Sequence, residues 1–146
     1  MHWFKYRGRA VLAEPLGELM ATYWEQHPMP VDSVAPVPLH AARLRERGYN
    51  QAALLACEMA RRTGLAVEDH TLIRQRATAS QVKLDARKRR ENVRDAFYCS
   101  GDDLAGKRVL LIDDVCTTGA TLEACAVALY AGGARSVQAL TLARAR

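Results

Sequence analysis

Apolar and polar stretches alternate along the chain in a way that predicts strands and helices in turn. Two stretches of strand length, 31–37 and 108–114, are largely apolar and run into polar sequence. Other stretches carry apolar side chains at the spacing of one helical face, and glycines follow two of them, as at many helix ends. We expect helices over 11–26, 49–63, 81–93 and 119–130, and further strands within 65–73, 96–99 and 136–142.

Largely apolar strands that alternate with helices are typical of a parallel sheet covered by helices on both faces. We therefore expect an α/β fold in one domain over 1–146. Ligands of such sheets bind at the carboxyl ends of the strands. The strands at 31–37 and 108–114 both lead into polar loops, as that rule requires, and the first of these loops, 39–48, is basic. Residues 74–80 are predicted to form a mobile loop.

The polar sequence after the second apolar strand predicts a phosphate site. Asp113 and Asp114 end this strand, and a turn rich in hydroxyl groups leads from them into a helix. Backbone N–H groups at the start of a helix bind anions, and Gly119 lets a ligand approach the backbone closely. Carboxylates suit sugar hydroxyls or a hydrated Mg²⁺ ion. A phosphate site beside carboxylates indicates a phosphorylated sugar as the ligand. The turn residues are Cys116, Thr117, Thr118, Gly119, Ala120 and Thr121.

The pattern Asp-Asp-x-x-Thr-Thr-Gly-x-Thr after an apolar strand resembles the phosphoribosyl pyrophosphate (PRPP) motif of type I phosphoribosyltransferases. Further segments resemble the ComF family of competence proteins, which have this fold and are linked to DNA uptake. The resemblance covers 36–143, nearly the whole chain. Its segments are PVPLH at 36–40, RGYNQA at 47–52, RAT at 76–78 and RENV at 90–93, with Gln81, Arg87 and Phe97.

The resemblance implies a type I phosphoribosyltransferase-like parallel sheet flanked by helices, with a flexible basic loop. Residues 1–30 would then form an N-terminal helix or a hood over the site. Asp113 and Asp114 would be the catalytic pair, holding the ribose hydroxyls directly or through Mg²⁺, and 116–121 would hold the 5-phosphate. The expected pyrophosphate ligands are Arg43, Arg47 and Gly48, and the expected ligand-facing residues of the flexible loop are Arg76, Gln81, Arg87 and Arg90.

The positive charge of the chain is concentrated in one segment. Residues 74–94 hold eight Lys and Arg but only two acidic residues, a net charge of +6, whereas the whole chain carries +5. Such a segment attracts polyanions, here pyrophosphate or nucleic acid. The alternative is a charged helix that is simply solvated.

The four cysteines predict no zinc site. None of them has the CxxC spacing of a zinc ribbon, with which many ComF-like proteins begin, so we expect a short or trimmed form of that family. Cysteines without a disulfide framework suit the cytoplasm. No apolar run approaches the roughly 20 residues of a membrane span, so membrane insertion is not expected. Cys57 and Cys125 fall on predicted helices, and we expect both in the core.

Three function classes remain open from the sequence. The first is an enzyme that binds PRPP with Mg²⁺ and transfers phosphoribosyl to a nitrogen acceptor. The second is a competence protein that binds single-stranded DNA or the DNA-uptake machinery, with PRPP as regulator or relic. The third is a PRPP sensor without catalysis. Residues 1–30 carry no polar pattern that identifies an acceptor base, and the oligomeric state is open.

Overall fold

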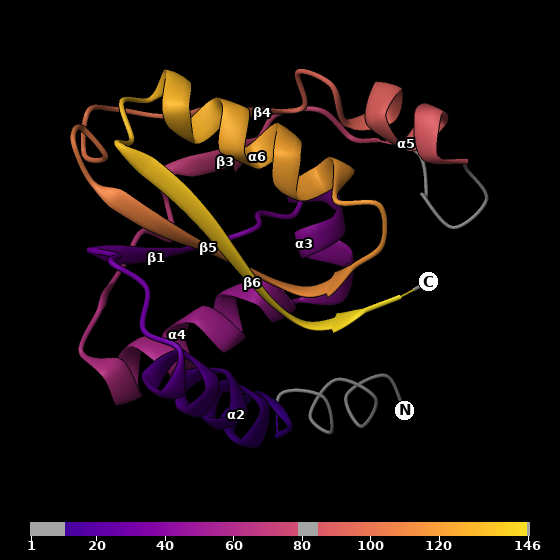
Figure 1. Cartoon of the computed structure of the whole chain (residues 1–146). Helices are drawn as coiled ribbons and strands as arrows, with labels where there is room; N and C mark the ends of the chain where they lie inside the picture. The colour runs from indigo at the N-terminus through magenta and orange to yellow at the C-terminus, as the bar shows by residue number, and fades with distance from the viewer. Residues whose placement is uncertain (1–10, 79–84, 146) are drawn as a thin grey trace.

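The computed structural model describes residues 11–78 and 85–145 and is built around a four-stranded parallel sheet (Figure 1). The strand order is β2-β1-β5-β6, and every neighbouring pair is parallel. The bounds are Ala66–Val67 for β2, Ser33–Pro36 for β1, Arg108–Cys116 for β5 and Ser136–Arg144 for β6. The predicted α/β fold class is confirmed.

Helices cover both faces of the sheet. Helices α2 (Ala13–Gln26) and α4 (Gln51–Thr63) lie on one face, and α6 (Ala120–Ala131) lies on the other (Figure 1). Beyond α6 lie α5 (Ala86–Val93) and a separate antiparallel pair of short strands, β3 and β4. The short strands span Leu72–Arg74 and Phe97–Cys99.

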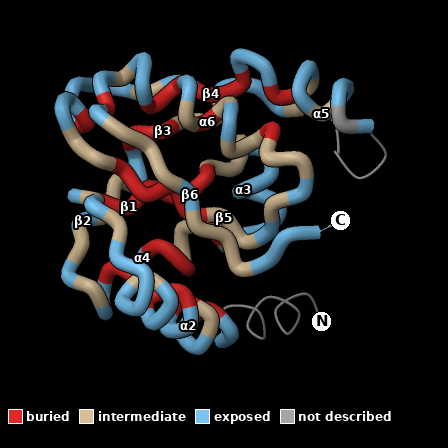
Figure 2. Tube along the Cα trace, in the orientation of Figure 1, coloured by how far each residue is buried: buried red, intermediate tan, exposed pale blue. Residues whose placement is uncertain are grey.

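Strand β5 supplies side chains to the core on each side of the sheet, as its alternation requires. Leu110 and Ile112 pack with α2 and α4, whereas Val109 and Leu111 pack toward α6. All four side chains are fully buried, and burial of an aliphatic side chain of this size contributes about 1.5–3 kcal/mol. Buried backbone accordingly runs through the centre of the sheet, between the helices of the two faces (Figure 2). The sheet therefore fixes the direction in which β5 leaves the core, and the polar residues that follow start from a rigid base.

The predicted basic loop over 39–48 is wrong, because most of this segment is helix α3 (Ala41–Arg47). The His40 imidazole accepts a hydrogen bond from the Ala42 N–H at 3.2 Å, which caps the first turn. Gly48 ends the helix with a φ of 81°, a left-handed conformation that favours glycine. The helix has no buried residue, so it lacks the apolar stripe by which sequence periodicity reveals a helix.

The other differences from the prediction are smaller. Strand β5 runs through Cys116, two residues further than predicted, and the antiparallel pairing of β3 with β4 was not predicted. Cys125 is buried as expected, but Cys57 is exposed, so its expected place in the core is wrong. Its position on α4 lies outside the buried face formed by Leu55, Ala56 and Met59.

Parts of two expectations fall outside the described residues. Of the expected hood, 1–10 lie outside, and most of the remainder is α2, which packs against α4. Helix α5 begins at Ala86; the predicted helical residues 81–84, with Gln81 among them, lie outside the described residues. None of the helices in the described part is long and apolar enough to cross a membrane.

Candidate functional site

The carboxyl end of β5 extends beyond the end of its neighbour β1. Its pairing with β1 stops where Ile112 meets Pro36, but its pairing with β6 continues until Cys116 meets Arg144. Asp113 and Asp114 lie on this projecting part. They therefore stand at the carboxyl edge of the sheet, where parallel sheets bind ligands.

A short turn joins the projecting strand to α6. This hydroxyl turn (116–121) reaches α6 through Gly119, whose φ of 81° is a conformation that other residues rarely adopt. The Thr118 hydroxyl accepts a hydrogen bond from the Ala120 N–H at 3.4 Å. The first N–H groups of α6 lie beside the turn, at the positive end of the helix dipole. The turn can therefore bind an anion through backbone and hydroxyl groups together.

The two carboxylates are unequal in their surroundings. Asp113 is largely removed from water and adjoins Asp114, and these two effects, burial first, raise the pKa of Asp113 to about 7. An Asp113 carboxylate oxygen accepts a hydrogen bond from the Asp114 N–H at 2.9 Å, and an Asp114 carboxylate oxygen accepts one from the Val115 N–H at 2.8 Å. Each carboxylate is thus oriented by the main chain, while a local excess of negative charge favours a cation nearby.

Arg74 is a residue of this site that the sequence did not single out. It ends β3, and its guanidinium lies 5.3 Å from the centre of the Phe97 ring and donates to the Thr78 hydroxyl. Burial lowers the pKa of Arg74, and the Asp113 carboxylate opposes that effect. Its Nε is buried and has no hydrogen-bond partner among the described residues. A half-buried cation with an unused donor is suited to an anionic ligand.

Arg74 shares a cavity of about 350 Å³ with the two carboxylates, and we call this the arginine cavity. Helix α3 contributes Arg43 and Arg47, which are four residues apart and so lie on one helical face. The predicted pyrophosphate ligand Gly48 is instead the C-cap of α3 and is not among the lining residues. The structure thus gathers three arginines around Asp113 and Asp114.

Asn50 has a structural role at the wall of the same cavity. Its side-chain oxygen accepts a hydrogen bond from the Ala52 N–H at 3.1 Å, which caps α4, and its amide donates to the Val37 carbonyl at 2.9 Å. Asn50 is therefore the N-cap of α4.

Two further cavities lie on the other side of the hydroxyl turn. The turn cavity, about 190 Å³, is lined by Asp113, Thr117 and Thr121 among others, and also by Arg89 from α5. The outer cavity, about 570 Å³, is lined by Arg89, Thr117, Thr118, Arg144 and Ala145. Arg89 was not singled out within its basic run. Only the register of β6 on β5, which places Arg144 opposite Cys116, could have identified Arg144.

The expected residues of the flexible loop that the structure describes do not line the cavities around the carboxylates, and Gln81 lies outside the described residues. Arg76 donates to the main-chain carbonyls of Asn92 and Arg94, and exposed Arg87 lies 3.8 Å from Glu91 in an ion pair. Neither lines the arginine, turn or outer cavity. Their role toward a ligand stays a prediction.

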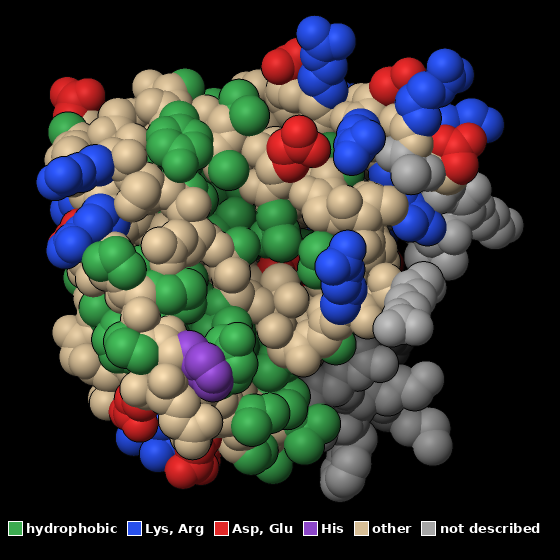
Figure 3. All heavy atoms as spheres, in the orientation of Figure 1, with side chains coloured by type: hydrophobic (Ala, Val, Ile, Leu, Met, Phe, Trp, Pro, Cys, Tyr) green, Lys and Arg blue, Asp and Glu red, His purple; other side chains and the backbone are tan. Residues whose placement is uncertain are grey.

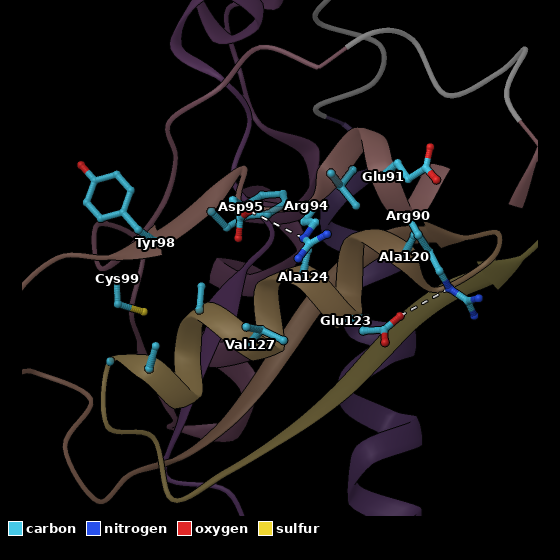
Figure 4. Close-up of a pocket in the computed structure, with 15 residues that line it drawn as sticks. Arg90, Glu91, Arg94, Asp95, Tyr98, Cys99, Ala120, Glu123, Ala124 and Val127 are labelled. Atoms are coloured by element: carbon cyan, nitrogen blue, oxygen red, sulfur yellow. Dashed lines mark ion pairs between the residues drawn. The ribbon is translucent and has the colours of Figure 1, made fainter. Parts of the chain in front are cut away.

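Arg90 lies instead at a larger cavity of about 780 Å³ along the outer flank of α6 (Figure 4). Figure 4 shows its side chain extended toward Glu123, with which it forms an ion pair of 3.7 Å, and Arg94 paired with Asp95. The apolar lining includes Phe97 and several alanines of α6. The remaining charged lining residue, Glu91, pairs with Arg87 of the same helix. This flank does not contain the carboxylates or the hydroxyl turn's threonines.

Lys and Arg side chains gather on the surface around α5, with some acidic side chains among them (Figure 3). This agrees with the charge of the 74–94 segment. Because Arg89 from the same helix reaches the hydroxyl turn, the basic surface adjoins the candidate site.

The sequence matches the family described as phosphoribosyl transferase domain over residues 50–146. It is 36% identical to the DNA utilization protein YhgH of Salmonella typhi over 99% of this chain and 65% of that protein. It is 37% identical to competence protein F of Haemophilus influenzae, over 78% of this chain and 51% of that protein. Competence protein ComFC of Bacillus subtilis is 34% identical, over 97% of this chain and 57% of that protein. The chain thus spans about half to two thirds of these relatives' length.

Solved structures share the fold. The glutamine PRPP amidotransferase of B. subtilis superimposes with a TM-score of 0.61 at 23% identity, over 89% of this chain and 26% of that one. The purine phosphoribosyltransferase of Pyrococcus horikoshii superimposes with a TM-score of 0.54 at 16% identity, over 89% of this chain and 71% of that one. At these identities the likeness concerns the fold alone.

Proposed function

Because this chain belongs to the phosphoribosyl transferase domain family, we propose that it binds PRPP with Mg²⁺ at the projecting end of β5. The observation that carries this proposal is the convergence of three different binding groups. An anion-binding turn, a carboxylate pair and a set of arginines line adjoining cavities. PRPP carries a phosphate, a ribose diol and a pyrophosphate, which need these three kinds of partner.

Each part of PRPP has a counterpart in this arrangement. The hydroxyl turn would bind the 5-phosphate, and Asp113 and Asp114 would bind the ribose hydroxyls. The pyrophosphate would lie in the arginine cavity, where guanidinium groups match phosphate oxygens in pairs. The unused Nε of Arg74 supports this placement, since a pyrophosphate oxygen would give it a partner.

The residues present fit Mg²⁺. Two carboxylates stand side by side, and burial, together with the neighbouring Asp114 carboxylate, raises the pKa of Asp113. A divalent cation would oppose both effects, because it favours the charged form of the carboxyl. When bound, Mg²⁺ supplies positive charge that stabilises pyrophosphate as a leaving group. Asp113 and Asp114 would hold it together with the ribose hydroxyls.

The reaction we propose is displacement of pyrophosphate from C1 of the ribose by a nitrogen nucleophile. Positive charge develops on the sugar ring as the bond to pyrophosphate breaks, and carboxylates that hold the ribose hydroxyls would stabilise it. Arg43, Arg47 and Arg74 would stabilise the negative charge that accumulates on the departing pyrophosphate. Positioning and electrostatics would thus account for catalysis.

A second candidate function is the binding of single-stranded DNA. The relatives carry the names DNA utilization protein and competence protein, which supports a role in DNA uptake for this chain. The basic surface around α5 is the observation that favours it, since Lys and Arg contacts with phosphates supply much of the affinity for nucleic acid. PRPP would then be a regulator of DNA binding. The third candidate is a protein that senses PRPP and catalyses no reaction.

Calorimetric titration of PRPP with Mg²⁺ tests the site. We expect saturable binding to the wild type and none to the double variant Asp113→Asn, Asp114→Asn. The matched control is Asp102→Asn, Asp103→Asn, which neutralises two adjacent exposed carboxylates before β5. Equal heats from the two double variants would refute the assignment of the carboxylates. Release of pyrophosphate with candidate nitrogen bases then separates an enzyme from a sensor.

A further inference from the structure

The outer cavity adjoins the turn cavity, and Arg89 and Thr117 line both of them. The outer cavity measures about 570 Å³, against about 190 Å³ for the turn cavity. Its volume lies in the range of sites for small organic ligands, about 300–1,000 Å³. In the proposed placement of PRPP the 5-phosphate is the last group at this end, so PRPP puts no group into the outer cavity.

The lining of the outer cavity is cationic. Helix α5 contributes Arg89 and strand β6 contributes Arg144, from either side of the hydroxyl turn (Figure 1). None of the described residues that line it is acidic, whereas the turn cavity is also lined by Asp113. Within the described part of the chain, Arg144 has no ion pair. Guanidinium groups match phosphate oxygens, so the lining favours a phosphoryl group.

The main chain fixes the position of Arg144 at the turn. Strand β6 pairs with β5 as far as Cys116, which lies opposite Arg144. The next N–H, from Ala145, donates to the Cys116 carbonyl at 2.9 Å. Arg144 is therefore anchored level with the first residue of the hydroxyl turn.

Thr118 adds a hydroxyl donor to the outer cavity. Its oxygen accepts a hydrogen bond from the Ala120 N–H at 3.4 Å, which leaves the hydroxyl hydrogen to be donated. Thr118 lines the outer cavity but not the turn cavity. A hydroxyl donor and two guanidinium groups thus line one cavity, a combination that suits the oxygens of a phosphoryl group.

The residues shared by the two cavities indicate that this phosphoryl group is joined to the 5-phosphate. A guanidinium has five N–H donors, so Arg89 can contact a phosphate in each cavity. Two separate anions would have to approach each other against their mutual repulsion. In a diphosphate, a covalent bond already holds the two groups together.

We propose that the hydroxyl turn and the outer cavity together bind ribose 5-diphosphates, a class that includes nucleoside 5′-diphosphates. The first phosphate lies in the turn, and the second contacts Arg89, Arg144 and Thr118. This rests on the proposed function, because the turn keeps its role as the 5-phosphate site. Such a ligand occupies the turn in place of PRPP, so a nucleoside diphosphate inhibits PRPP binding by competition.

Calorimetric titration of uridine 5′-monophosphate (UMP) and uridine 5′-diphosphate (UDP) tests the second phosphate site. EDTA in the buffer removes divalent cations, through which a diphosphate could bind the carboxylates instead. We expect the wild type to bind UDP about tenfold more tightly than UMP, the order of magnitude of one charge-assisted hydrogen bond. Equal affinities, or no binding of UDP, would overturn the proposal.

Arg144→Gln locates the second phosphate, and Arg135→Gln is its control. Arg135 is exposed just before β6, at the amino end of the strand, so each variant loses one exposed positive charge. The preference for UDP over UMP should fall to about twofold or less in R144Q and persist in R135Q. Equal losses in the two variants would reduce the preference to a general effect of charge and overturn the site.

Arg47→Gln tests the competing placement of the diphosphate in the arginine cavity. Arg47 lines that cavity and does not line the outer cavity. R47Q should keep the preference for UDP. A preference that survives in R144Q and is lost in R47Q would assign the diphosphate to the arginine cavity and contradict the proposal.

Titration of PRPP with Mg²⁺ separates this proposal from the proposed function. R144Q keeps the main-chain pairing with Cys116 and should bind PRPP within about twofold of the wild type. PRPP binding without a preference for UDP would overturn the diphosphate site and leave the PRPP site intact. A preference for UDP that depends on Arg144, without PRPP heat, would support the diphosphate site and overturn PRPP binding. Simultaneous binding of UDP and PRPP would refute their shared use of the turn, and with it this proposal.

Discussion

Arg76 donates a hydrogen bond to the main-chain carbonyl of Asn92, sixteen residues further along the chain. A second bond from the same guanidinium reaches the carbonyl of Arg94, and the Gln75 amide donates to the Asp95 carbonyl at 3.0 Å. The segment after β3 is thereby fastened to the segment after α5. These bonds therefore add to the packing of α5 against α6, which holds Arg89 at the hydroxyl turn.

Arg76→Ala should therefore loosen α5 rather than remove a ligand contact. Loss of two exposed hydrogen bonds should lower the free energy of unfolding by about 1–2 kcal/mol. We expect faster amide exchange in α5, measured by mass spectrometry, and a PRPP affinity reduced only severalfold. Arg87→Ala, which removes an exposed ion pair on the same helix, is the control. Abolished PRPP binding with unchanged exchange would show that Arg76 contacts the ligand directly.

The stability of the protein should fall as the pH rises from about 4 to about 7 in the absence of divalent cations. Asp113 has a pKa of about 7 in the folded protein and an ordinary value of 3.8, so in this range the folded state binds more protons than the unfolded state. The contribution of this carboxyl should be on the order of a few kcal/mol. Urea unfolding in EDTA at several pH values measures it. Asp113→Asn should flatten the dependence, and a slope that persists in this variant would assign it to other groups.

Gly119→Ala should weaken PRPP binding more than it destabilises the fold. A Cβ there meets nothing within 4 Å, so the cost is the left-handed backbone, about 1–2 kcal/mol. Gly106→Ala is a close match, because its φ is 72° and its Cβ also meets nothing within 4 Å. Gly106 precedes β5, however, whereas the turn follows this strand. Thermal unfolding should shift similarly in the two variants, whereas calorimetry should show weaker PRPP binding for Gly119→Ala only. Weaker binding in both would point to a general loss of folded protein.

Neutralising residues 87–90 should weaken the binding of single-stranded DNA and flatten its dependence on salt. For each phosphate of the strand that the variant no longer neutralises, the slope of log K against log salt should fall by about 0.7. Anisotropy measurements over a series of salt concentrations give this slope. An unchanged salt slope in the variant would show that residues 87–90 do not contact the DNA. Absence of DNA binding by the wild type at low salt would contradict a DNA-binding function for this chain.

The sequence predicted the sheet and the position of Asp113 and Asp114 at the end of a strand, because both depend on local patterns. Leu110 and Ile112 belong to an apolar run that could only be a buried strand, and Asp113 follows them directly. Thr117, Thr118 and Gly119 follow one another directly before α6, and Gly119 supplies the left-handed backbone there. Such features need no knowledge of distant residues.

The features that were missed depend on tertiary contacts. Helix α3 buries no side chain, so only its helix-forming composition and its caps could have revealed it. Arg74 joins the site through the pairing of β3 with β4, which are short strands far apart in sequence. Arg144 joins it through the register of β6 on β5. None of these relationships leaves a periodic signal in the sequence.

The carboxylate pair stands on a part of β5 that is paired on one side only. Beyond Ile112 the ladder with β1 has ended, and β6 alone continues beside it, up to Arg144. The site therefore stands on a strand that is anchored in the core at one end and hydrogen-bonded along one edge only. Its stiffness comes from strand β6 rather than from the ligand groups themselves. Substitutions in the last residues of β6 should consequently be felt at Asp113 even where no side chain touches a ligand.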